Sequence, residues 1–209
     1  MKLGIDLDHT IINYHDVFLR TAKQKGLVPD VFSGDKDDIK KHIQSRYTEK
    51  DWMSLQGCVY GDGIRQAKLM PYIAEFLQFC RQLSIPFVII SHKTKYGHFD
   101  ANKIDLRNTA RGWLAEQQFF DPKFLGLQDD ELFFTETRGE KLAMIRKQQC
   151  TLFIDDLLDL LLEPEFPANI HRVWYAYGKK SIESIPHDIS VIDDWRQAIG
   201  MLKSVICLN

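Results

Sequence analysis

Short apolar runs recur along this 209-residue chain, and amphipathic segments separate them. Several runs are continuously apolar, as in parallel strands that are buried on both faces. Strands are predicted at 2–7, 86–91, 131–135, 151–154, 171–176 and 189–192. Helices are predicted from apolar residues at helical spacing in 71–83, 102–118, 139–149 and 194–204. This alternation predicts the α/β class, with a doubly wound parallel sheet flanked by helices.

Residues 13–69 interrupt the alternation. They contain no convincing strand, and apolar spacing predicts one helix around Val17 to Ala22 and another around Ile39 to Tyr47. We therefore expect a small helical module inserted after the first strand. The core would then consist of residues 1–12 and 70–209.

The composition excludes several classes of protein. A net charge of −2 gives no basic field for nucleic acid or an anionic membrane. No apolar stretch approaches the roughly 20 residues that span a bilayer, and aspartates interrupt the N-terminal apolar run, so no signal peptide is expected. The four cysteines are far apart and form no Cys-x-x-Cys pair, which argues against zinc and favours free thiols in a cytoplasmic protein. The oligomeric state stays open.

Two aspartates, Asp6 and Asp8, follow the first predicted strand, and Thr10 comes next. A period of two would send both carboxylates to the same side, where like charges repel. A hard divalent cation with oxygen ligands, such as Mg²⁺, would satisfy them. The alternative is a strand that ends in a solvated acidic turn.

Polar residues also end two later strands. Ser91 follows the second strand and could donate a hydrogen bond to a phosphate oxygen, or serve as a turn residue or helix cap. Asp155 and Asp156 directly follow the fourth strand, where buried carboxylates need a cation or strong donors. The alternative is a pair of acids at a helix N-terminus, which is also our interpretation of Asp193-Asp194.

Lys141 opens a predicted helix shortly before the fourth strand. A solvated lysine on a helix face would be the ordinary interpretation. Lys93 and Lys147 are alternatives for any role that needs one lysine near the acids.

The chain resembles the haloacid dehalogenase superfamily of phosphohydrolases in the order of its motifs. These motifs are Asp6-Leu7-Asp8-His9-Thr10, Ser91, Lys141 and Asp155-Asp156. The resemblance covers nearly the whole chain and implies a Rossmann-like core. Residues 13–69 match only as an insertion of the right size, at the position that the family uses for its C1 cap.

The resemblance implies a role for each motif residue. Asp6 would form an aspartyl-phosphate, and Asp8 would protonate the leaving alcohol and then activate water. Mg²⁺ would bind the Asp6 carboxylate, the Asp8 backbone carbonyl and Asp156, with Asp155 supporting these metal ligands. Ser91 and Lys141 would hold the phosphoryl oxygens.

The implied activity is a Mg²⁺-dependent phosphomonoesterase that acts on a small phosphorylated metabolite, such as a sugar phosphate or nucleotide. A phosphomutase keeps both acids and stays open, as does a catalytically silent binding or regulatory module. Basic residues of the insertion would meet an anionic substrate or form a solvated helix face: Lys36, Lys40, Lys41, His42 and Arg46. The loop 92–103 is a second candidate for specificity.

Overall fold

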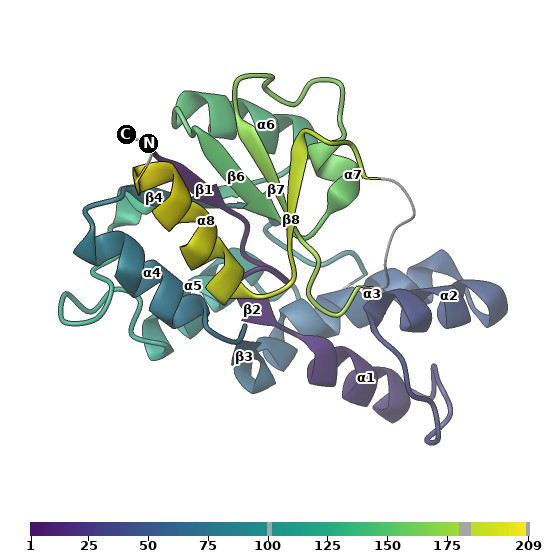
Figure 1. Cartoon of the computed structure of the whole chain (residues 1–209). Coiled ribbons are helices and arrows are strands. Elements are labelled where there is room, and N and C mark those ends of the chain that lie inside the picture. Colours follow the sequence, from purple (N-terminus) through teal and green to yellow (C-terminus); the bar gives the residue numbers. More distant parts are fainter. Residues whose placement is uncertain (100–101, 180–184, 208–209) are drawn as a thin grey trace. The chain divides into compact units, whose positions relative to one another are not determined.

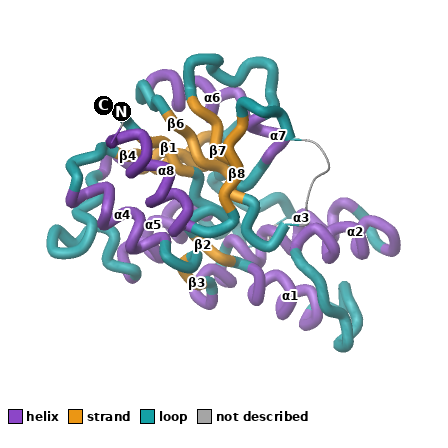
Figure 2. Tube along the Cα trace, viewed as in Figure 1, coloured by secondary structure: helices purple, strands orange, loops and turns teal. Residues whose placement is uncertain are grey.

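The computed structural model describes residues 1–99, 102–179 and 185–207. The chain forms two compact units. The core unit contains Met1–Ile12, Leu69–His92 and Phe119–Asn209, and the second unit contains Asn13–Lys68 and Lys93–Gln118. The sequence analysis placed residues 93–118 in the core, whereas in the structure they group with the inserted segment. Figures 1 and 2 show that the strands gather mainly in the core unit.

The core unit contains a six-stranded parallel sheet with the strand order β5-β4-β1-β6-β7-β8. Its members are β1 (Leu3–Ile5), β4 (Phe87–His92), β5 (Leu132–Thr135), β6 (Leu152–Asp155), β7 (His171–Tyr175) and β8 (Ile189–Ile192). The sheet confirms all six predicted strands and the α/β class. In the register, Ile5 pairs with Ile89 on one side and with Ile154 on the other. The carboxyl ends of β4 and β6 therefore flank the end of β1.

Helices cover both faces of this sheet (Figure 1). On one face, α4 (Ile73–Gln82) packs beside α8 (Trp195–Cys207), and the rings of Phe76 and Trp195 lie 4.7 Å apart. On the other face, α6 (Arg138–Lys147) and α7 (Leu158–Leu161) pack over an apolar cluster that includes Phe153 and Trp174. Both sides of the central strands are thus buried, which explains their continuously apolar sequences.

Gly4 allows close packing at the centre of the sheet. A Cβ atom at Gly4 would lie 2.4 Å from Cδ2 of Phe153 on the neighbouring strand. Any larger residue would force that ring to move. Phe153 in turn lies 5.4 Å below the Lys141 ammonium group, measured to the ring centroid. The absence of a side chain at Gly4 therefore helps to place the ring beneath a candidate functional residue.

The second unit is mainly helical. It contains α1 (His15–Gln24), α2 (Lys36–Arg46), α3 (Glu49–Tyr60), the 3₁₀ helix η1 (Asp62–Gln66) and α5 (Leu106–Glu116). Capping boxes begin α2 at Asp35 and α3 at Thr48. The sequence analysis predicted helices near α1 and α2 but missed α3, whose buried Trp52, Leu55 and Val59 carry the helical spacing. Residues of α5 contact η1, so the segment 93–118 packs with the insertion.

Two very short strands, β2 (Ile12–Asn13) and β3 (Lys68–Leu69), pair with each other where the chain passes from one unit to the other. The sequence analysis expected no strand in residues 13–69. Strands this short leave no period-2 pattern, so local sequence gives no signal for them.

No helix among the described residues is long and apolar enough to cross a membrane. Cys58, Cys80 and Cys150 are free thiols. Burial raises the pKa of Cys80 to about 12 and that of Cys150 to about 11, so both stay protonated at neutral pH. These two thiols therefore pack as small apolar side chains.

Candidate active site

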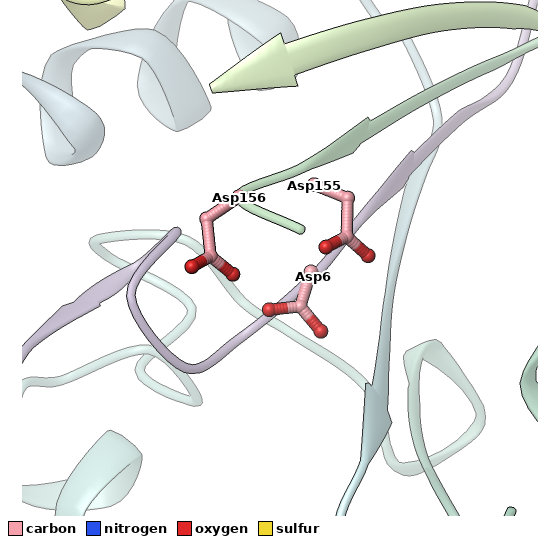
Figure 3. Close-up of side chains that lie close together, drawn as sticks. All are labelled: Asp6, Asp155 and Asp156. Carbon is pink, nitrogen blue, oxygen red and sulfur yellow. The ribbon is translucent and has the colours of Figure 1, made fainter. Parts of the chain in front are cut away.

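Acidic side chains from two neighbouring strands meet at the carboxyl edge of the sheet (Figure 3). Asp6 directly follows β1, and its backbone N–H donates to the Ile154 carbonyl at 2.9 Å. Asp155 ends β6, and Asp156 comes next. One carboxylate oxygen from each of these three aspartates lies within 4.8 Å of the others, and all three residues are buried. Two motifs separated by most of the chain thus form one cluster.

Lys141 is the lysine that joins this cluster. Its Nζ donates to Asp6 Oδ1 at 2.5 Å and to Asp155 Oδ2 at 2.7 Å, and the residue is only 1% exposed. Thr137 begins α6 with a capping hydrogen bond to the Glu140 N–H, so Lys141 lies near the start of that helix. Among the alternatives, Lys147 is exposed at the end of α6, and Lys93 belongs to the second unit.

The two adjacent aspartates differ in their contacts. Asp155 is fully buried, and both of its oxygens accept from the chain: Oδ2 from Lys141 and Oδ1 from the Leu157 N–H at 2.8 Å. Asp156 is 6% exposed, and its backbone carbonyl accepts from Trp174 Nε1 at 3.0 Å. Asp155 therefore holds Lys141 with one oxygen and the Leu157 N–H with the other, and the assignment of Asp156 as the metal ligand stays a prediction.

The electrostatics of the cluster follow from burial. Burial raises the pKa of Asp6 to about 8; Lys141 opposes this rise, while Asp155 and Asp156 add to it. For Lys141, burial lowers the pKa, but the charges of Asp155 and Asp6 outweigh burial and hold it above its usual range. Lys141 contacts two of the three carboxyl groups. A divalent cation accepts oxygen ligands of this kind and would lower the repulsion between neighbouring carboxylates.

The loop after Asp6 is tight. The Leu7 carbonyl accepts from the N–H groups of both Ile11 and Ile12 at 2.9 Å, and the His9 N–H donates to the Ile12 carbonyl at 2.8 Å. His9 adopts a left-handed φ of 63°, which is uncommon for a residue other than glycine. Asp8 lies half-buried in this loop, and its carboxylate is not part of the cluster of three aspartates. The predicted role of Asp8 in metal binding is through its backbone carbonyl and stays a prediction.

Thr10 makes a contact that the sequence analysis did not assign. Its hydroxyl donates to Asp6 Oδ2 at 3.3 Å, and the residue is fully buried. Its backbone carbonyl accepts from Trp195 Nε1 at 3.2 Å. The threonine was visible in the first motif, but nothing in the sequence linked Trp195 to it.

Ser91 lies at the same edge of the sheet as Asp6. It is 1% exposed in β4, and its carbonyl accepts from the Thr135 hydroxyl at 3.3 Å. The register that pairs Ile5 with Ile89 brings Ser91 level with the loop after Asp6. Its predicted contact with phosphate stays a prediction.

The second acidic pair, Asp193-Asp194, has the role that the sequence predicted. The Asp193 N–H donates to Gln197 Oε1 at 3.0 Å, and Asp194 pairs with Arg196 at 2.7 Å. These contacts begin α8. The structure thus confirms that this pair is a helix start.

Among the described residues of the second unit, five lysines lie over aromatic rings: Lys36, Lys40, Lys50, Lys93 and Lys95. Lys36 is 5.7 Å from the ring centroid of Phe18, Lys40 is 5.9 Å from that of Trp52, and Lys93 is 4.9 Å from that of Tyr60. Lys36 and Lys40 are half-buried. The prediction that the loop 92–103 contributes to specificity includes residues 100–101, which lie outside the described residues.

No family model matches this chain, and no curated protein does. Solved structures do resemble it. A HAD-superfamily hydrolase from Ehrlichia chaffeensis has 16% identity and a TM-score of 0.57, covering 98% of this chain and 97% of that one. A haloacid dehalogenase-like hydrolase from Streptococcus pneumoniae has 15% identity and a TM-score of 0.59, covering 96% and 97%. A HAD family hydrolase from Deinococcus radiodurans with bound phosphate and sodium has 13% identity and a TM-score of 0.53, covering 97% and 95%. The chain therefore has the fold of these hydrolases.

Proposed function

We propose that this chain is a member of the haloacid dehalogenase superfamily and a Mg²⁺-dependent phosphomonoesterase. The observation that carries the proposal is the buried cluster in which Lys141 contacts both Asp6 and Asp155, with Asp156 beside them. Such a cluster is costly for folding alone, because buried carboxylates lose their hydration. Strongly perturbed groups of this kind gather at functional sites. The shared fold of the solved hydrolases supports the same conclusion.

The donor set fits Mg²⁺. The carboxylate oxygens of Asp6 and Asp156 are hard ligands, and the Asp8 carbonyl would add a third. When bound, the cation would neutralise the charge of the nucleophile and of the phosphate. The Deinococcus radiodurans hydrolase, which shares this fold, has bound phosphate and sodium, and the proposed binding of an anion and a cation agrees with that.

Residues of the cluster and of the loop after Asp6 would have separate roles in the reaction. Asp6 attacks phosphorus, and the bond between phosphorus and the leaving oxygen breaks. Asp8 gives a proton to that oxygen and then takes one from the water that hydrolyses the aspartyl-phosphate. Attack requires the ionised form of Asp6, and Lys141 favours that form against the effect of burial. Thr10 fixes the other oxygen of the same carboxylate.

Ser91 and Lys141 are proposed to hold the phosphoryl oxygens. Their contribution to catalysis would be electrostatic, because negative charge spreads over these oxygens in the transition state. The proposed substrate is a small phosphorylated metabolite of the sugar phosphate or nucleotide class, and a cytoplasmic location is part of the same proposal. Phosphomutase activity is the second candidate, since a mutase uses both Asp6 and Asp8 in the same way.

Hydrolysis of p-nitrophenyl phosphate tests the proposal. We expect phosphate release that requires Mg²⁺, stops with EDTA and returns when Mg²⁺ is added in excess. The Asp6→Asn variant is the matched control, because it keeps the shape of the nucleophile and removes its charge. A wild-type protein that is folded and binds Mg²⁺ but has no more turnover than this variant would support the silent module instead. A panel of phosphorylated metabolites would then identify the substrate class.

A further inference from the structure

Two buried tryptophans donate hydrogen bonds to the two loops that carry the acids. Trp195 begins α8 and is fully buried; its Nε1 donates to the Thr10 carbonyl at 3.2 Å. Trp174 lies in β7 and is 3% exposed; its Nε1 donates to the Asp156 carbonyl at 3.0 Å. Neither tryptophan belongs to any of the motifs. Each nevertheless reaches the backbone of a residue next to the proposed chemistry.

These contacts hold backbone that lies past the ends of strands. Thr10 and Asp156 both follow the strands that precede them, and the carbonyl of each accepts from one of the two tryptophans. A buried carbonyl without a donor is costly, and a buried indole N–H likewise needs an acceptor. Each tryptophan satisfies both requirements at once. The positions of the two loops therefore depend on side chains that are distant in the sequence.

The contact of Trp195 continues to the nucleophile. Thr10, whose carbonyl it holds, donates its hydroxyl to Asp6 Oδ2. Trp195 is itself held by the rings of Phe76 at 4.7 Å and Tyr175 at 5.1 Å, measured between centroids. The start of α8 thus holds the Thr10 backbone through Trp195. Thr10 holds one oxygen of the Asp6 carboxylate, and Lys141 holds the other.

We propose that Trp195 and Trp174 are positioning residues with separate effects. Trp195 acts through Thr10 to orient the Asp6 carboxylate for attack, and Trp174 acts through the Asp156 backbone to aim that carboxylate at the cation. The inference rests on the proposed function for the roles of Asp6 and Asp156. A misplaced nucleophile slows the chemical step, because reactivity depends steeply on geometry. A misplaced ligand weakens metal binding instead, as loss of supporting contacts does in metal sites.

The role of Trp195 in orienting the nucleophile is tested with Trp195→Phe, Thr10→Val and their double variant. Phenylalanine keeps an aromatic ring and removes the donor, and valine keeps the shape of threonine without the hydroxyl. We expect kcat to fall about 3–10-fold in each single variant, as for the loss of one hydrogen bond, with KM within about twofold of wild type. If the two residues act in series, the double variant should be no more than about twofold slower than Thr10→Val. Thr10→Ser should recover most of the loss.

The role of Trp174 in metal binding is tested with Trp174→Phe, and this test does not require an active enzyme. Mg²⁺ is titrated calorimetrically in the absence of substrate. We expect the Kd to rise about 10-fold or more in Trp174→Phe and to stay within about twofold in Trp195→Phe. Trp113→Phe is the control for losing a buried indole, because Trp113 is 3% exposed in α5 of the second unit, which contains none of the proposed catalytic residues. It should leave kcat and the Kd unchanged.

The outcomes separate the two proposals. Wild-type protein without turnover would overturn the proposed function, whereas the metal titration would still decide the role of Trp174. An active wild type whose Trp195→Phe variant keeps full kcat, or whose double variant shows additive losses, would overturn the role of Trp195. Equal changes in kcat and Kd for all three Trp→Phe variants would indicate a general packing effect and overturn both roles.

All variants must first show cooperative thermal unfolding. If Trp195→Phe does not fold, the comparison of Thr10→Val with Thr10→Ser decides whether the Thr10 hydroxyl orients Asp6. Equal kcat values in these two variants would overturn the proposed orientation of the nucleophile.

Discussion

Lys141 Nζ lies 2.5 Å from Asp6 Oδ1, although 135 residues separate the two in the sequence. The same ammonium group lies 2.7 Å from Asp155 Oδ2. A single buried cation thus joins acids that end two neighbouring strands. This arrangement gives Lys141 a structural role beside the functional role that we propose for it, and the two roles can be measured separately.

We expect Lys141→Met to destabilise the protein and abolish turnover. The substitution leaves two buried carboxylates without their cation, and breaking such a buried pair typically costs about 3–5 kcal/mol. Urea unfolding at neutral pH measures the change in the free energy of unfolding. Lys147→Met is the control, since Lys147 is exposed on the same helix and should change stability by less than about 0.5 kcal/mol. Similar effects of the two substitutions would contradict the proposed role of Lys141.

Asp6→Asn should remove turnover and change how stability depends on pH. In the metal-free protein the pKa of Asp6 is raised from 3.8 to about 8, so between these values the folded state holds a proton that the unfolded state has lost. The free energy of unfolding should therefore fall as pH rises through this window, by up to about 1.4 kcal/mol per pH unit.

Asparagine does not titrate, so this contribution to the pH dependence should disappear in the variant. Urea unfolding in EDTA across pH 5 to about 9 measures the difference. An unchanged slope would show that Asp6 is not the group that takes up the proton. Retention of more than a few per cent of wild-type kcat would exclude Asp6 as the nucleophile.

Asp155→Ala should mainly affect stability, whereas Asp156→Ala should mainly affect the Mg²⁺ dependence of activity. Asp155 accepts hydrogen bonds from Lys141 and from the Leu157 N–H, so its loss should mainly lower stability, by about 3 kcal/mol or more. Asp156 is the proposed ligand, so its loss should mainly raise the Mg²⁺ concentration needed for activity. Thermal unfolding and a Mg²⁺ titration separate the two. A larger Mg²⁺ requirement in Asp155→Ala would reverse the ligand assignment.

Gly4→Ala should destabilise the core. The new Cβ would lie 2.4 Å from Cδ2 of Phe153, and overpacking of this kind costs about 1–3 kcal/mol. Gly112→Ala is a matched control, because a Cβ there meets nothing within 4 Å and the residue lies within α5. The control should be neutral or stabilising by up to about 1 kcal/mol. Denaturant unfolding compares the two, and an equal effect would show that Phe153 moves freely.

Lys36→Gln tests whether the second unit selects the substrate. Lys36 lies over the Phe18 ring, and removing its charge should raise KM about 2–5-fold for metabolites that carry an anionic group besides the scissile phosphate, while leaving p-nitrophenyl phosphate, which has no such second group, unaffected. Lys25→Gln is the control, since Lys25 is exposed in the same unit and is not among the candidate specificity residues. Point variants are preferable to deleting residues 13–69, because α5 packs with η1 and would lose its partner. An unchanged substrate ranking in Lys36→Gln would remove this lysine from the list of specificity residues.

The sequence by itself determined the class of fold and placed the candidate acids at strand ends. Continuous apolar runs such as 87–90 and 152–154 mark strands buried on both faces, and this signal is local. Parallel strands place their carboxyl ends at one edge, and the sequence places both Asp6 and Asp155 at the ends of predicted strands. The helix missed at Glu49–Tyr60 also carries a local signal, in the spacing of Trp52, Leu55 and Val59.

Only the tertiary structure decided which polar groups meet. Lys93, Lys141 and Lys147 were all candidates from the sequence, and the packing of α6 on the sheet brings Lys141 to the acids. The grouping of residues 93–118 with the insertion was decided in the same way, by contacts between distant segments. The donors to the acid-bearing loops, Trp195 and Trp174, left no motif in the sequence. Hydrogen bonds between distant residues depend on where whole helices and strands pack, and the periodicity of a segment records only which of its own faces is buried.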